Sequence, residues 1–105
     1  MTQTIYRYGL GRSNNVKVDM QIPQDAIVLH VEYDRNSSEF CLWVIVLTDV
    51  TKTDIRSFYI SGTGMDLSKN LKGDETMGHI ASFSVDASTM QGWFHAFEIL
   101  YPEAG

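Results

Sequence analysis

The segment Ser61-Gly62-Thr63-Gly64 is the part of this sequence whose residue types most suggest a binding site. It follows an apolar stretch that is expected to form a strand. Two glycines at a strand end can turn consecutive backbone N–H groups toward one concavity, where a phosphate could sit. No Lys-Ser or Lys-Thr follows, so the segment is not a P-loop. A plain turn, in which glycine supplies a positive φ, is the alternative reading.

Other side chains could complete such a site around Gly62, Thr63 and Gly64. Some could supply positive charge to a phosphate, and aromatic rings could stack a base. The basic candidates are Arg56, Lys69, Lys72 and His79, and the aromatic candidates are Tyr59 and Trp93. These nine residues together are the predicted ligand-binding site.

A catalytic site is not evident in the sequence. Covalent catalysis needs a nucleophile within reach of a base that a third group orients. Cys41 is the one thiol, and it lies in the apolar run Phe40–Leu47, where burial makes a thiol unreactive. His95 is expected to be a core histidine beside Trp93 and Phe97, and no Gly-x-Ser-x-Gly elbow occurs. We therefore expect a protein without enzymatic activity.

Metal ligands are also not clustered along the chain. The histidines His30, His79 and His95 are far apart, no His-Glu-x-x-His motif occurs, and a lone cysteine cannot form a Cys pair. The sequence accordingly predicts no metal site and no cofactor.

The elements that would position these residues are strands, because apolar and polar residues alternate with a period of two. In the best example, Val16, Val18, Met20 and Ile22 share one face. Seven predicted strands can be read from the sequence, and one of them, at 40–47, is a continuous apolar run. They cover residues 5–10, 16–22, 27–34, 40–47, 55–61, 79–85 and 93–100.

The strand at 40–47 is apolar on both faces, so it is expected to be a central strand that is covered on both sides. The strands at 16–22 and 27–34 are expected to pair with each other across the turn at Pro23. Residues 88–92 form a loop or one helical turn. The longest loop is expected at 65–78, where the chain is polar and poorly periodic.

These elements predict a single all-β domain over residues 1–105. Six to seven short, mainly antiparallel strands are typical of a small sandwich or a partly closed barrel. At 105 residues with 44% hydrophobic side chains, the chain is long enough to bury one core without metals or disulfides.

Composition limits the classes of partner and the cellular compartments that we expect for this protein. The formal charge of −5 argues against sequence-blind binding to nucleic acid, which depends on dense Lys and Arg. No stretch reaches the 18 to 20 apolar residues of a spanning helix, and the N-terminus does not resemble a signal peptide. With its single cysteine, the protein is expected in a reducing cytoplasm and away from membranes.

Several short motifs occur in an order that resembles a family of uncharacterised small proteins of bacteriophages and their bacterial hosts. They are Ile5-Tyr6-Arg7-Tyr8, Cys41-Leu42-Trp43-Val44, the Gly-Thr-Gly turn with its preceding strand, His79-Ile80-Ala81-Ser82-Phe83 and the closing His95-Ala96-Phe97-Glu98. The family pattern has a histidine after Gly-Thr-Gly, where this chain has Met65. The resemblance implies a phage context and the cytoplasm of a host bacterium.

Three classes of function remain open at this stage. The first is a non-catalytic protein that sequesters a small phosphate-bearing ligand, such as a nucleotide-like immune signal of the host, between the subunits of a homo-oligomer. The second is an antagonist that binds a host protein through an acidic surface with Asp66, Asp74 and Glu75. The third is a small structural or virion-associated module.

Overall fold

The computed structural model describes residues 2–65, 67, 75–88 and 90–100. These residues form seven strands, and none of them is helical. The strands are β1 (Gln3–Gly11), β2 (Lys17–Pro23), β3 (Ile27–Asp34), β4 (Glu39–Leu47), β5 (Thr53–Gly62), β6 (Thr76–Ala87) and β7 (Met90–Leu100). Since no described residue is helical, the described part contains no helix that could cross a membrane. The prediction of an all-β chain is confirmed.

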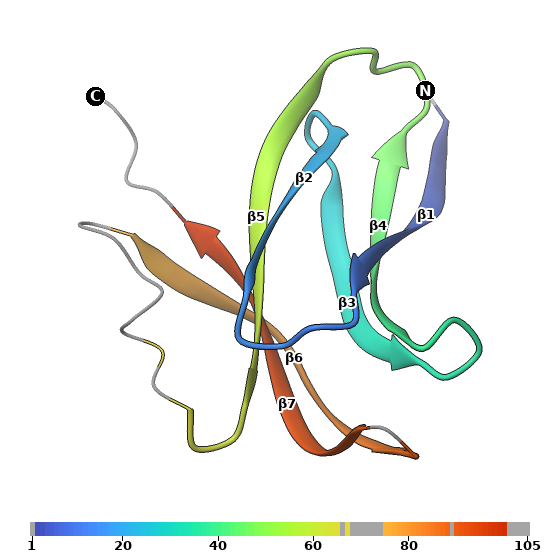
Figure 1. Ribbon diagram of the computed structural model, residues 1–105. Coiled ribbons are helices and arrows are strands. Elements are labelled where there is room, and N and C mark those ends of the chain that lie inside the picture. Colours follow the sequence, from blue (N-terminus) through green and yellow to red (C-terminus); the bar gives the residue numbers. More distant parts are fainter. Residues whose placement is uncertain (1, 66, 68–74, 89, 101–105) are drawn as a thin grey trace.

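Two antiparallel sheets make up the fold. One has three strands in the order β1-β4-β3, and the other has four in the order β2-β5-β7-β6. Figure 1 shows β1 and β4 on one side of the molecule and β5, β6 and β7 on the other. The architecture is therefore the predicted sandwich and not a closed barrel.

Aromatic and aliphatic side chains between the sheets form the core. Phe40 on β4 is fully buried, and its ring contacts Phe83 on β6 and Phe94 on β7, with centroids 6.0 and 5.6 Å away. Because side chains alternate along a strand, the neighbours of each core residue on its own strand point away from the core. Each sheet thus has an inner face toward the other sheet and an outer face away from it.

The predicted pairing between residues 16–22 and 27–34 is wrong. β2 pairs with β5, and β3 pairs with β4, so the chain changes sheets between Pro23 and Ile27. The amide of Ala26 donates to the carbonyl of Pro23 in this turn, and that of Gln24 donates to the carbonyl of Lys52. Proline ends β2 because it has no N–H for a ladder, and buried Ala26 lets the chain pass between the sheets.

β4 is central in its sheet, as predicted, but it is not covered on both sides. Phe40 and Val44 on its inner face are fully buried, whereas Trp43 and Ile45 on its outer face are partly exposed. Nothing in the described residues forms a third layer over this face, so the second apolar face of β4 remains partly in solvent.

Two predicted loops are shorter than expected. β6 begins at Thr76, so residues 76–78 of the predicted loop at 65–78 belong to a strand. Residues 66 and 68–74 of that loop lie outside the described part of the chain. At the other connection, β7 begins at Met90, so much of the predicted loop at 88–92 belongs to β7. The β6–β7 hairpin is therefore long.

Candidate functional site

A row of hydrogen-bonded side chains crosses the outer face of the four-stranded sheet. It consists of Thr63, His95, Ser82 and His79, and we call these four residues the polar row. Thr63 Oγ1 lies 2.8 Å from His95 Nε2, and His95 Nδ1 lies 2.8 Å from Ser82 Oγ. Ser82 Oγ lies 2.9 Å from His79 Nε2. The row thus joins the turn after β5 to β7 and β6.

Strand register brings these residues together. Ser82 on β6 lies directly opposite His95 on β7, and Ser61 on β5 lies opposite His95 on the other side. The pairing of β6 with β7 shifts between His79 and Ala81, which is a bulge at Ile80. Without this bulge, residues 79 and 82 would point to opposite faces, because their numbers differ by three.

The turn at Gly62–Gly64 is anchored to the neighbouring strand. The amide of Thr63 donates to the carbonyl of Trp93 at 3.2 Å, and its hydroxyl lies 3.5 Å from the same oxygen. Gly64 has a φ of 90°, whereas Gly62 has no positive φ. The positive φ of Gly64 fits the reading as a plain turn, and the turn holds Thr63 in the polar row. The amides of Thr63 and Met65 are bonded to the carbonyls of Trp93 and Gly62, so they do not form the predicted phosphate nest.

One choice of histidine tautomers assigns a donor and an acceptor to every hydrogen bond of the polar row. If the Thr63 hydroxyl donates to the carbonyl of Trp93, it must accept its hydrogen bond with His95 from Nε2–H. His95 Nδ1 then accepts from Ser82, and Ser82 accepts from His79 Nε2. In this arrangement every link has one donor and one acceptor. No hydrogen bond joins Nδ1 of His79 to another described residue, and this atom accepts when the ring is neutral and donates when the ring is protonated.

A depression of about 160 Å³ adjoins one end of the row. Its lining residues come from the end of β5, the following turn and β7, and they are Ser61, Gly62, Thr63, Gly64, Met65, Leu67, His95 and Phe97. Trp93, two residues before His95 on the same face of β7, is 59% exposed. Hydrogen-bonding groups and an exposed flat ring therefore lie on one face.

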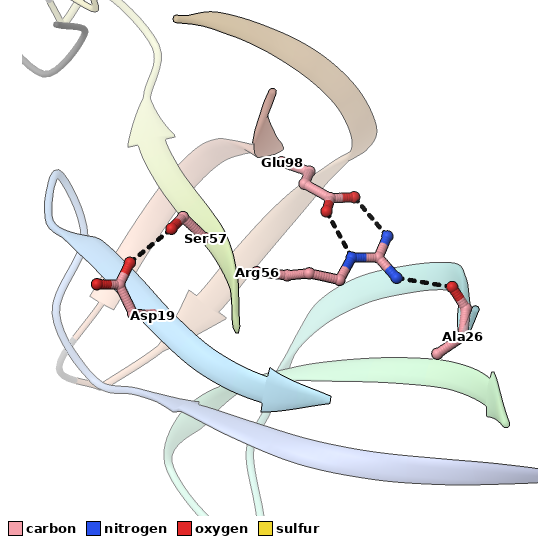
Figure 2. Close-up of polar contacts among 5 residues, drawn as sticks. All are labelled: Asp19, Ala26, Arg56, Ser57 and Glu98. Atoms are coloured by element: carbon pink, nitrogen blue, oxygen red, sulfur yellow. Dashed lines mark hydrogen bonds and ion pairs between the residues drawn. The ribbon is translucent and has the colours of Figure 1, made fainter. Parts of the chain in front are cut away.

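Not all the predicted site residues belong to this face. Arg56 lies on the inner side of β5, in phase with the core residues Phe58 and Ile60. Its Nε and Nη2 donate to the two carboxylate oxygens of Glu98 at 2.6 and 2.7 Å, and its Nη1 donates to the carbonyl of Ala26 at 2.6 Å (Figure 2). The hydrogen bonds to Glu98 raise the pKa of Arg56. Arg56 is thus held by protein groups and joins the two sheets.

Arg56 lines a second depression, to which the turn does not contribute. It has a volume of about 410 Å³, and it is lined by residues that include Arg56, Glu98, Gly78 and His79. Gly62 and Gly64 do not line it. The structure therefore brings His79 close to Arg56 on one side and, through the polar row, to Thr63 on the other, but it does not place Arg56 with the glycines.

Tyr59 also does not fit its predicted role. Its side chain is only 1% exposed, so the ring cannot stack a ligand at the surface. Lys69 and Lys72 lie outside the described residues, as do Asp66 and Asp74 of the predicted acidic surface. Glu75 lies 3.9 Å from Lys17, and this contact offsets its charge.

His95 is not the core residue that the sequence suggested. It lies half-buried on the outer face and is bonded through both ring nitrogens. Ser82 was missed as well, because a single serine in a strand gives no signal until the register places it between two histidines. Cys41 is buried as expected, and desolvation raises the pKa of its thiol.

Metal binding finds no support in the part of the chain that the structure describes, where no group of three His, Cys, Asp or Glu residues is arranged to hold an ion.

Polar contacts outside the polar row have a structural role. For example, the Ser57 hydroxyl donates to Asp19 Oδ1 at 2.6 Å and connects β5 to β2 (Figure 2).

The fold and the site thus define a two-sheet β-sandwich with a polar row and an exposed tryptophan on one outer face. The chain belongs to a family described as a domain of unknown function, DUF7352, which matches residues 1–103. No curated protein and no solved structure matches the chain.

Proposed function

We propose that the protein is a non-catalytic binding module that holds a small, phosphate-bearing, nucleotide-like ligand on the outer face of the four-stranded sheet. The observation that carries the proposal is the polar row beside the Gly62–Gly64 turn. When His79 is protonated, its Nδ1–H can donate to a phosphate oxygen, while Ser82 and Thr63 hold the two histidines in the row. The exposed ring of Trp93 offers a stacking surface for a base.

The charge of the molecule favours a small ligand over a nucleic acid strand. The formal charge is −5, and Arg56 is neutralised by Glu98. Without a dense basic surface, binding depends on a few well-placed donors, and these suit one or two phosphates. In a phage context, such a module would sequester a nucleotide signal of the host's immune response in the cytoplasm of the bacterium.

Binding fits the geometry better than catalysis does. Ser82 has a ring nitrogen within 2.9 Å on each side, as an activated nucleophile would. However, the group that orients His95 is the neutral hydroxyl of Thr63 and not a carboxylate. Ser82 is also exposed on the outer face, so water is not excluded from it.

Thermal shift against a panel of linear and cyclic nucleotides tests the proposal. A ligand that binds the native state raises the melting temperature by mass action, and the rise grows as the ligand concentration exceeds the Kd. Ser82→Ala removes the acceptor that holds protonated His79, and because a hydrogen bond to a charged group contributes about 1.5–3 kcal/mol, the variant should weaken binding by roughly ten- to a hundredfold. Trp93→Ala should weaken it as well.

Ser84→Ala is a stringent control, because Ser84 is exposed on the same face of β6 and lies opposite Trp93. Binding by this variant should equal that of the wild type. If no nucleotide shifts the melting temperature, or if Ser82→Ala and Ser84→Ala behave alike, the site is not a nucleotide site. Turnover of an activated ester that Ser82→Ala abolishes would show catalysis instead.

A further inference from the structure

Among the edge strands of the described residues, β1 is the one whose edge is least protected against pairing. β1 lies at the edge of the three-stranded sheet, where it pairs with β4 alone, and Figure 1 shows it at the margin of the molecule. A free edge presents a row of unpaired N–H and C=O groups that can pair with another strand. Ile5 and Tyr6 in the middle of β1 are 59% and 46% exposed, so both faces of this edge are open.

The other strand edges in the described residues carry features that discourage pairing. β2 has Lys17 and Asp19 and ends in Pro23. β3 and β6 each contain a register shift and lie close to each other. Such charges, prolines and bulges are the means by which proteins protect an edge. From Gln3 to Tyr8, β1 has none of them except the single charge of Arg7, and its bulge is confined to Gly9–Gly11.

The hydrogen bonds of β1 show which of its residues face the open edge. The amide of Thr48 donates to the carbonyl of Thr2 at 2.9 Å, so the backbone groups of Thr2 point toward β4. Backbone groups alternate in direction along an antiparallel strand. Those of Thr4, Tyr6 and Tyr8 therefore also point toward β4. Those of Gln3, Ile5 and Arg7 point to the open edge.

The outer face suggests what pairs with this edge. Ile5 lies opposite Ile45 on β4, and Ile45 lies opposite Ile27 on β3, so three isoleucines cross the whole sheet in one row. Ile5 and Ile27, at the ends of the row, are 59% and 55% exposed. A second copy that meets β1 at Ile5 would continue this row with three further isoleucines.

We propose that two copies of this chain form a dimer in which their β1 strands pair antiparallel about a two-fold axis at Ile5. Ile5 of each copy donates to and accepts from Ile5 of the other, and Gln3 of one copy lies opposite Arg7 of the other. The two three-stranded sheets become one six-stranded sheet. This dimer does not depend on the ligand proposed above, which binds the other sheet.

Other registers of the same pairing are less favourable. An axis at Arg7 would place two arginines directly opposite each other, and like charges in that position are destabilising. An axis at Gln3 would shorten the overlap of the two strands and would break the row of isoleucines. Among the axes at a residue that faces the open edge, the one at Ile5 places apolar side chains opposite each other across the new junction.

Sedimentation velocity over a concentration series tests the dimer with three lysine variants. The wild type should change from the 11.9 kDa monomer to twice that mass as the concentration rises. Ile5→Lys places two like charges at the axis and should leave only the monomer. Ile27→Lys alters the far end of the same row, and Ile55→Lys alters an exposed isoleucine of the other sheet, so both should still dimerise.

Ile5→Cys gives a readout that does not depend on the effect of a lysine. Opposed residues of a hydrogen-bonded antiparallel pair have Cα atoms about 5.5 Å apart, which suits a disulfide. Mild oxidation should therefore link two chains through residue 5, whereas Ile55→Cys should not be linked. Circular dichroism confirms that each variant keeps its strands. The proposal is overturned if the wild type stays monomeric at every concentration, if Ile5→Lys still dimerises, or if Ile27→Lys also prevents dimerisation, since the faces and not the edges would then meet.

Discussion

Among the single residues, Arg56 shows most clearly how position decides the role of a side chain. A basic residue on a strand near a glycine-rich turn suggested a phosphate ligand. In the structure Arg56 has the inner phase of β5 and is held by Glu98 and the carbonyl of Ala26. The carbonyl belongs to the segment that enters the other sheet, so this one guanidinium connects both layers of the sandwich.

Glu98→Ala should therefore destabilise the fold. It leaves the partly buried Arg56 guanidinium, whose side chain is 24% exposed, without its carboxylate. Losing hydrogen bonds to a charged group costs about 2–3 kcal/mol, and urea unfolding measures this loss directly. The double variant Arg56→Met with Glu98→Leu should recover much of the stability, because an apolar pair leaves no unpaired charge. Equal stability of Glu98→Ala and the wild type would show that the ion pair contributes nothing.

At the scale of elements, alternation in the sequence predicted where strands lie but not which strands pair. The pattern in residues 16–22 fixes which side chains are buried, and it is the same whether the partner strand is the next one or a distant one. The partner of β2 is β5, because the short turn after Pro23 moves the chain to the other sheet.

The polar row illustrates the same limit at the site. Thr63 was identified from its glycine neighbours and His79 from its type. Ser82 and His95 become their partners only through the register of the β6–β7 hairpin, which depends on the bulge at Ile80. A bulge of this kind has no clear signature in one sequence, so no pattern along the chain links Ser82 with either histidine.

The turn after β5 can be tested with its two glycines as a matched pair. Gly64 has a φ of 90°, a conformation in which a Cβ is strained, whereas Gly62 has no positive φ and a Cβ there would meet its nearest atoms at 3.8 Å. We expect Gly64→Ala to cost about 1 kcal/mol in urea unfolding and Gly62→Ala to cost less than half of that. Gly64→Ala should also weaken ligand binding, because the turn positions Thr63. Equal costs at the two positions would argue against the strained turn.

At the scale of the whole molecule, the inner and outer faces of the two sheets have different roles. The inner faces hold the two sheets together through residues such as Phe40, Phe83 and Phe94. The outer face of one sheet carries the polar row, and the outer face of the other carries the row of isoleucines that ends at the free edge of β1. Stability, ligand binding and self-association can therefore be changed separately.

Phe40 and Trp93 provide the test of this division. Phe40 is fully buried, and its ring touches Tyr33 in its own sheet and Phe83 and Phe94 in the other. Truncating such a ring costs about 3–5 kcal/mol, a large part of the roughly 5–15 kcal/mol that stabilises a domain, so Phe40→Ala should be close to unfolded. Phe40→Leu keeps most of the volume and should lose about 1.5 kcal/mol or less.

Trp93→Ala removes an even larger ring, but that ring is 59% exposed. We expect its free energy of unfolding to stay within about 0.5 kcal/mol of the wild type, as for most surface positions. Urea unfolding of the Phe40 and Trp93 variants, followed by circular dichroism, compares the two faces in one experiment. A Trp93→Ala variant as unstable as Phe40→Ala would mean that the Trp93 ring supports the fold. Weaker ligand binding by this variant would then not show that the ring stacks on the ligand.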